Sequence, residues 1–214
     1  MSGLSVLTTS QVLLRLNQEP QDGIYDLRNI DFREVNIRQK ELRERFEAIA
    51  KIARAAGTDH PIYIDFSGSN LTGRGFYELD LSHTLMNSVN AERAVLAGSD
   101  LSDVQFDNSN LNYADMRYTK LNFTKFHNTS IVGVNFTGAD LSTARGLNFG
   151  STDREVIERL GVVGRIYDAK LPPEVEKIRN KLIAAISSHF PRKKRNMSVR
   201  KVVAANSGAT ASEW

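Results

Sequence analysis

The side chains most able to do chemistry in this sequence are four histidines, a set of recurring aspartates and a basic run near the C-terminus. His60, His83, His127 and His189 are scattered, and there is no cysteine to complete a metal site with them. The sequence contains no nucleophile elbow, no glycine-rich phosphate loop and no zinc-protease helix motif. We therefore predict no catalytic residue, no metal site, no cofactor and no small-molecule substrate.

The aspartates Asp80, Asp100 and Asp140 are separated by multiples of twenty residues, and Lys120 occupies the position between the last two. If residues twenty apart lie in one column, these carboxylates are clustered, and clustered carboxylates can act as catalytic acid–base groups. A lysine in the same column instead indicates a solvated face on which it relieves repulsion between neighbouring carboxylates.

The basic run lies in a segment rich in cations, because residues 151–214 carry 13 Lys and Arg against 7 Asp and Glu. This run predicts association with nucleic acid or with an anionic membrane. No aromatic residue interleaves it, so stacking on bases is not expected. A solvated tail without a partner is the competing interpretation. The partner-binding candidates are Arg192, Lys193, Lys194, Arg195, Arg200 and Lys201.

An apolar residue recurs at every fifth position from Phe66 to Leu141, sixteen times in succession. A five-residue period fits neither a helix nor a flat strand, so the chain must turn a corner in each repeat to keep these residues inside. Residues two positions before these centres are small or apolar except Arg74, where we expect a local bulge or an irregular edge beside a binding surface. The core candidates are Phe66, Leu71, Phe76, Leu81, Leu101, Phe106, Leu121, Phe126, Phe136 and Leu141.

The triplets Ser99-Asp100-Leu101, Ala114-Asp115-Met116 and Ala139-Asp140-Leu141 resemble the motif of the pentapeptide-repeat family. The resemblance implies a right-handed quadrilateral parallel β-helix with four repeats, or twenty residues, in each coil. Alternate centres support an even number of sides, because the Phe and Met residues all fall in one set and the other set has no aromatic residue. Sixteen repeats then predict four coils and a stack of roughly 19 Å.

The segments around the repeats predict α-helices. Residues 1–24 form an N-terminal segment, and residues 25–150 hold the β-helix, including a partial first coil over 25–38. An α-helical insertion at about 39–57 is expected to cover the N-terminal mouth of the solenoid, or alternatively to bind a partner. Residues 151–190 predict a C-terminal helical cap, and residues 191–214 a disordered basic tail.

The leading functional hypothesis is a non-enzymatic protein–protein interaction scaffold with an unidentified protein partner. No apolar stretch is long enough to span a membrane and no secretory signal is visible, so we expect a cytoplasmic location. Some members of the resembled family are bacterial effectors delivered into host cells without a classical signal peptide. Others imitate DNA and bind topoisomerases with long acidic β-helices, from which this sequence departs because residues 62–150 carry only 9 acidic against 6 basic residues.

Overall fold

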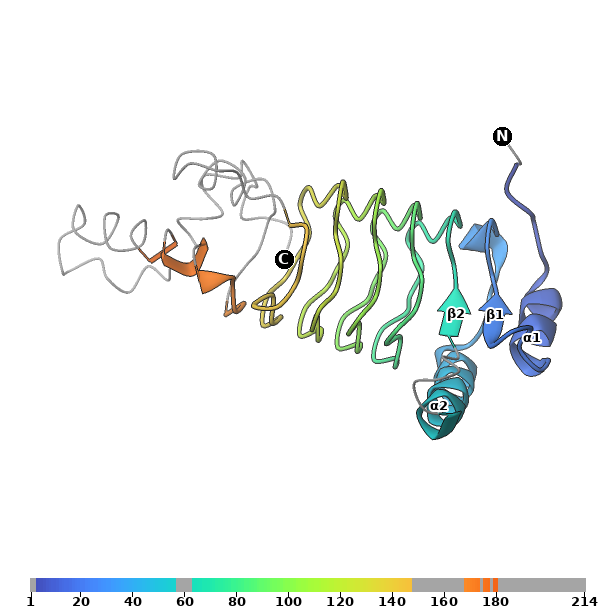
Figure 1. Ribbon diagram of the computed structural model, residues 1–214. Helices are drawn as coiled ribbons and strands as arrows, with labels where there is room; N and C mark the ends of the chain where they lie inside the picture. The colour runs from blue at the N-terminus through green and yellow to red at the C-terminus, as the bar shows by residue number, and fades with distance from the viewer. Residues whose placement is uncertain (1–2, 57–62, 148–167, 174, 178, 181–214) are drawn as a thin grey trace.

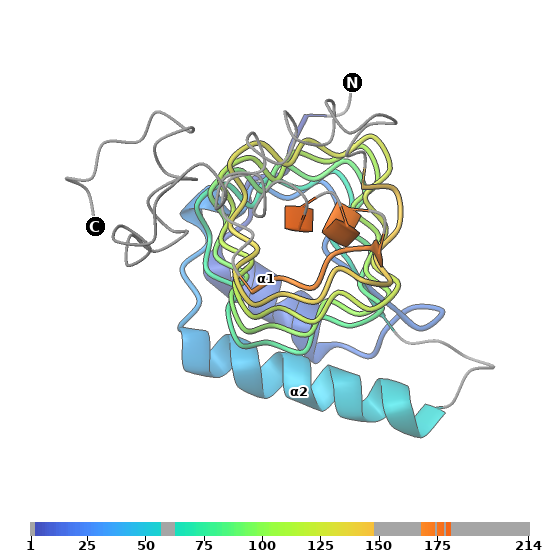
Figure 2. The same ribbon diagram turned by 90° about the vertical axis from the view of Figure 1, so that its left-hand side faces the viewer.

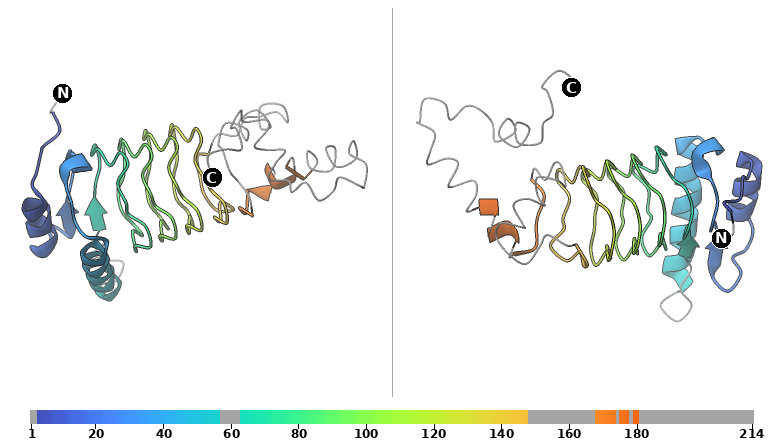
Figure 3. Two further views of the ribbon diagram at one scale, coloured as in Figure 1. Left: turned by 180° about the vertical axis from the view of Figure 1, so that it is seen from behind. Right: turned by 90° about the horizontal axis from the view of Figure 1, so that it is seen from above.

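The computed structural model describes residues 3–56, 63–147, 168–173, 175–177 and 179–180. Its helices and strands are, in chain order, α1 (Thr9–Asn17), β1 (Ile24–Asp26), the 3-10 helix η1 (Phe32–Glu34), α2 (Gln39–Ala56) and β2 (Tyr63–Asp65). After β2 the chain winds through a stack of coils joined by single β-bridges (Figures 1 and 3). None of the described helices is long and apolar enough to cross a membrane.

Parallel bridges join each coil to the next at every fifth residue, with partners twenty residues apart. The first rungs of the four resulting ladders are Asp65↔Leu85, Asn70↔Asn90, Gly75↔Val95 and Asp80↔Asp100. Four ladders in twenty residues give each coil four sides, which superimpose when viewed along the stack (Figure 2). We name these the Asp65, Asn70, Gly75 and Asp80 sides.

Each corner between two sides is a tight turn, as where the Ser69 amide donates to the Phe66 carbonyl at 3.0 Å. In all fifteen repeats from Gly68 to Gly138 the second turn residue has a left-handed φ, between +54° and +74°. Only five of these residues are glycine, although a left-handed conformation costs other residues about 1–2 kcal/mol. From Gly68 to Tyr118 the amide of each of these residues donates to a carbonyl of the next coil, and every non-glycine residue at this position is exposed.

The interior of the coils is filled by the predicted centres. All ten core candidates are at most 3% exposed, and of the sixteen centres only Ile131 is half-buried. Phe106 and Phe126, one coil apart, stack with ring centroids 5.6 Å apart. Small polar residues two positions earlier are also buried and satisfied: the Ser99 hydroxyl donates to the Phe76 carbonyl at 2.7 Å.

A partial coil precedes the regular stack. β1 pairs in parallel with β2, and Asp31 bridges Asn70, so residues 24–37 lie one coil before residues 63–76. Ser5 adds a further bridge, to Ile30. α1 lies at this end of the stack and buries Val12 and Leu16 (Figure 1).

α2 lies along the outside of the coils, whereas the sequence led us to expect it over the N-terminal mouth (Figure 2). The chain leaves the partial coil at Gln39, where α2 begins. Phe46 is 1% exposed and stacks on Phe66 with centroids 6.2 Å apart. Arg43 pairs with Glu78 and Arg54 with Asp80, which holds α2 against the Asp80 side. The mouth is covered by α1 instead.

Arg74 does not cause the expected bulge, because the ladder continues in register from Asn70↔Asn90 to Gly75↔Val95. Its guanidinium reaches the partial coil, where Nη2 donates to the Val35 carbonyl at 2.6 Å. The chain leaves the partial coil soon after Val35, so the Val35 carbonyl can accept a hydrogen bond from a side chain.

At the other end the chain returns to the stack after residues that lie outside the described part. The Leu141 amide donates to the Lys170 carbonyl at 2.7 Å, and the Lys170 amide donates to the Ala139 carbonyl at 2.9 Å. Leu171, 4% exposed, therefore extends the core by one rung before the helical residues 173, 175–177 and 179–180. The sequence predicted only helices in 151–190, and the first of them, from Thr152 to Gly161, lies outside the described residues.

Candidate interaction surface

The aspartate column lies on the Asp80 side, where Asp80, Asp100, Lys120 and Asp140 are consecutive rungs. Each carboxylate has a cationic partner, as the solvated-face interpretation requires. The ion pairs are Arg54–Asp80 at 2.6 Å, Lys120–Asp100 at 3.0 Å and Lys170–Asp140 at 2.8 Å. Each of these carboxylates is therefore held in an ion pair with a cation rather than beside another carboxylate.

The carboxylate of Asp100 shows how the ionised form of these aspartates is stabilised. Burial raises its pKa, but hydrogen bonds from the Ser102 hydroxyl and amide and from Lys120 outweigh burial and bring the pKa below its ordinary value. The Ser102 hydroxyl donates to Asp100 Oδ1 at 2.6 Å. The pKa of Asp140 is lowered in the same way by Lys170 and Ser142, against the opposing effect of burial.

The two histidines that the structure describes each lie beside one carboxylate. His83 Nδ1 lies 3.7 Å from Asp103 Oδ2, and His127 Nδ1 lies 3.0 Å from Asp107 Oδ1. Within the described part of the chain, no group of three or more His, Asp or Glu residues could hold a metal ion. His60 and His189 lie outside that part, as do all six basic candidates from Arg192 to Lys201.

Three exposed aromatic side chains occupy successive corners of one coil. Tyr113, Tyr118 and Phe123 all sit at the left-handed turn position, with φ of 60°, 58° and 59°, and are 55%, 66% and 48% exposed. We call these three residues the aromatic belt. The next coil has Gly133 and Gly138 below the two tyrosines, and a Cβ at either glycine would lie within 2.5 Å of a tyrosine ring. The tyrosine rings therefore lie against the glycine backbone.

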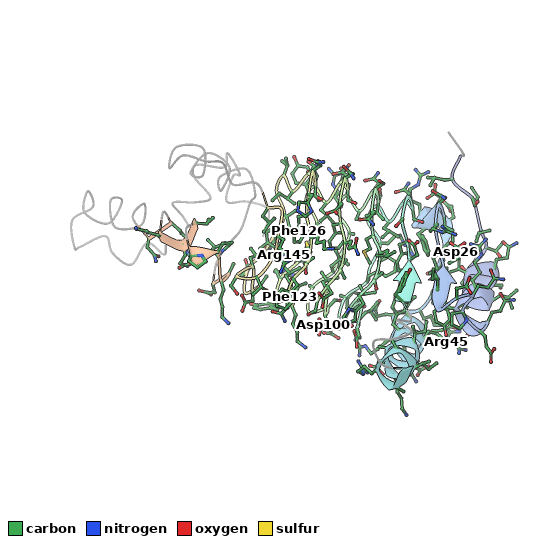
Figure 4. All side chains as sticks on the ribbon, viewed as in Figure 1. Asp26, Arg45, Asp100, Phe123, Phe126 and Arg145 are labelled. Carbon is green, nitrogen blue, oxygen red and sulfur yellow. The ribbon has the colours of Figure 1, made fainter. Side chains whose placement is uncertain are left out.

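Cations flank the belt on both sides along the stack. The Arg93 guanidinium lies 5.3 Å from the centroid of Tyr113, and that of Arg145 lies 5.7 Å from the centroid of Phe123 (Figure 4). Cation–π contacts of this kind fix both partners in place. Sequence reasoning missed the belt, although three aromatic residues at five-residue spacing, each two after an apolar centre, are the signal that would have found it.

A groove opens between α2 and the coils, with a volume of about 820 Å³. Ile49, Ala50 and Ala53 line it from α2, and Leu85, Gln105 and Lys125, three consecutive rungs of the Asp65 side, line it from the coils. His83 and Asp103 line it at the corner between the Asp80 and Asp65 sides, two coils and one coil before Phe123, respectively. The groove and the belt therefore meet at this corner.

Comparison with known families finds one match: the model described as pentapeptide repeats matches residues 76–112 and 109–145, in eight copies. These residues make up most of the regular coils, and the match confirms the resemblance seen in the repeat triplets. No curated protein matches the sequence.

Solved structures with similar coils are distant in sequence. Rfr23 from the cyanobacterium Cyanothece 51142 is 16% identical, with 51% of this chain and 54% of that chain covered and a TM-score of 0.29. The protein alr5209 from Nostoc PCC 7120 is 20% identical, with 58% and 93% covered and a TM-score of 0.37. QnrB1, a plasmid-mediated fluoroquinolone resistance protein, is 12% identical, with 56% and 65% covered and a TM-score of 0.27. The chain thus spans about half the length of the Cyanothece protein.

Proposed function

The chain is a pentapeptide-repeat protein, and from this premise we propose that it is a non-enzymatic scaffold that binds a protein partner on the outer faces of its coils. Pentapeptide-repeat proteins are often protein-interaction scaffolds. For the coils we infer the right-handed quadrilateral β-helix that the family implies.

The aromatic belt is the observation that carries this proposal. Isolated exposed apolar residues are ordinary, but three aromatic side chains at successive corners of one coil form a band around two of its sides. Tyrosine and arginine are enriched among the residues that dominate binding energy at protein interfaces. Because Tyr113 and Tyr118 already rest on glycine backbone, a partner would bind them with little further loss of side-chain entropy.

A cross-linking pull-down with the full chain tests the proposal. The belt variant Tyr113→Ser/Tyr118→Ser/Phe123→Ser should retain less than a tenth of the protein captured by the unmodified chain. The control Asn108→Ser/Asn128→Ser changes the same turn position at the fourth corner and should capture as much as the unmodified chain. Equal capture by the belt variant would move the interface elsewhere, and absence of any cross-linked protein would contradict the scaffold proposal.

We further propose a cytoplasmic location in the producing cell and delivery into a host cell as a bacterial effector. An enzymatic reporter fused after the full chain tests delivery, and a signal no higher than that of a secretion-deficient strain would contradict it. Deleting residues 3–24 would be a poor test, because Ser5 bridges Ile30 and Val12 and Leu16 belong to the core.

Two alternative functions can be tested by separate assays. A DNA mimic needs a continuous acidic strip, whereas the aspartates of the Asp80 side are neutralised by Arg54, Lys120 and Lys170. We therefore expect supercoiling by DNA gyrase to be unchanged at saturating protein, and inhibition would favour the mimic. Association of the basic tail with nucleic acid or anionic membrane stays a prediction. It requires binding that weakens with added salt and disappears when residues 191–214 are removed.

A further inference from the structure

The groove beside α2 has an apolar wall and an open rim. Ile49, Ala50 and Ala53 of α2 face Leu85 on the coils across it. The side chains of Arg54 and His83, which also line the groove, are 66% and 65% exposed, so an occupant would enter from solvent along its length. An open trough of this kind fits an extended chain better than an enclosed small molecule, which pockets normally surround.

The groove lining carries the cations Arg54 and Lys125 and the carboxylates Asp80 and Asp103, with His83 charged only when it is protonated. Asp80 is neutralised by Arg54 at 2.6 Å, and Asp103 faces His83 at 3.7 Å. Lys125 is half-buried and has no carboxylate partner among the residues that the structure describes. Its neighbour on the next rung is a second cation, Arg145, and like charges on adjacent rungs repel each other. An anionic group placed at this end of the groove would relieve that repulsion.

We propose that the groove binds an acidic peptide segment of the protein partner. An apolar side chain of the segment packs between Ala53 and Leu85, and a carboxylate that follows it pairs with Lys125. Leu85 and Lys125 are two rungs apart, which is about 10 Å at the usual strand spacing and about three residues of extended peptide. The partner chemistry is therefore an apolar residue followed within about three residues by Asp or Glu.

This inference rests on the proposed scaffold function and names the partner's chemistry. The groove and the aromatic belt share the corner that carries His83, Asp103 and Phe123, so one partner can occupy both. Phe123 lies beside Arg145 on this part of the molecule (Figure 4). The peptide segment in the groove would then determine which partner binds, and the rest of the interface would extend over Phe123.

The test selects peptides from a displayed random nine-residue library on the full chain and measures the affinity of the selected peptides by fluorescence anisotropy. We expect enrichment of Asp and Glu next to Leu, Ile or Phe. Ala53→Phe, which fills the groove, and Lys125→Glu, which reverses its charge, should each weaken binding at least tenfold. The matched controls Ala48→Phe and Arg45→Glu change exposed positions of α2 outside the groove and should weaken it less than twofold (Figure 4).

Selected peptides without acidic enrichment would overturn the proposal, and so would unchanged affinity in both groove variants at an unchanged melting temperature. Binding of laurate, lost in Ala53→Phe, together with failure to select peptides would assign the groove to a small amphiphile and also overturn it. A partner that the belt variant loses but both groove variants retain would contradict the groove alone. A chain that captures no protein would contradict the scaffold itself.

Discussion

The left-handed residue at each corner allows this chain to present bulky side chains where tight turns usually require glycine. Gly133 and Gly73 occupy this position on the same edge, with φ of +69° and +66°. A Cβ at Gly73 would meet nothing within 4 Å, but one at Gly133 would lie 2.5 Å from the Tyr113 ring. Gly73→Ala should therefore lower the free energy of unfolding by about 1 kcal/mol through backbone strain alone.

Gly133→Ala should cost about 2 kcal/mol or more, because the Tyr113 ring must also move. Adding Tyr113→Ala to Gly133→Ala should bring the loss back towards that of Gly73→Ala. Urea denaturation of the three variants measures these differences. Equal losses in the two glycine variants would show that the ring does not rest on Gly133.

The lowered pKa of Asp100 makes a pH-dependent contribution to stability. A carboxyl group whose pKa is lower in the folded chain stabilises it at pH values above its unfolded pKa of about 3.9. That contribution is lost as the pH falls through the folded value. Asp100→Asn keeps an oxygen for the Ser102 amide, as Asn110 does for Asn112, but no longer titrates.

The melting temperature of Asp100→Asn should therefore fall less than that of the unmodified chain between about pH 5 and pH 2.5. Thermal denaturation followed by circular dichroism across this range gives the comparison. Ser88→Ala, at an exposed corner without a titrating group, serves as the control and should parallel the unmodified chain. Parallel curves for Asp100→Asn as well would mean that this carboxyl does not contribute.

At the level of elements, the ring of Phe46 is the most deeply buried contact between α2 and the stack. Phe46 is 1% exposed against Phe66, whereas Ile52 on the same helix is 48% exposed. Phe46→Ala should lower the free energy of unfolding by about 3–5 kcal/mol, because removal of a buried ring leaves a cavity. Ile52→Ala should change it by less than about 0.5 kcal/mol. Guanidinium denaturation measures both, and similar small effects would mean that α2 is only loosely docked.

The placement of α2 shows where sequence reasoning reaches its limit. The helical spacing of Leu42, Phe46, Ile49 and Ala53 predicted the helix and its inward face, and the first three are buried while Ala53 is half-buried. It could not predict which surface that face meets, because an amphipathic stripe carries no information about its partner. Arg43 and Arg54, which pair with Glu78 and Asp80, could have indicated the side.

Over the whole molecule, the five-residue period of the sequence translates directly into the ladders. Each side of a coil holds one apolar centre, so residues twenty apart in the sequence fall in the same column. This spacing alone predicted the interior columns and placed Lys120 next to Asp100. The return of the chain at Lys170 was not predicted, since the residues between Asp140 and Lys170 do not continue the regular repeat. Ala169 and Leu171 keep the small and apolar positions of the repeat and its frame of five, but Lys170 departs from the motif, and one triplet is too short a signal to stand alone. The aromatic belt was not predicted because the repeat pattern was taken from the inward-facing positions, and the belt residues lie at the corners.

The stack should behave as one cooperative unit, because each coil is held by the coils on either side. Leu101 is fully buried between Leu81 and Leu121 in the interior of the Asp80 side. Leu101→Ala should cost about 3 kcal/mol through its cavity, and Leu101→Asp more, since it buries an unpaired charge. Asp103→Ala, at the neighbouring exposed corner, should change stability by less than about 0.5 kcal/mol.

Hydrogen exchange distinguishes a cooperative stack from independent coils. Leu101→Ala should lower protection equally for the Val95 amide before it and the Lys125 amide after it, both of which are hydrogen-bonded between coils. Loss of protection at only one of these amides would mean that the coils unfold separately.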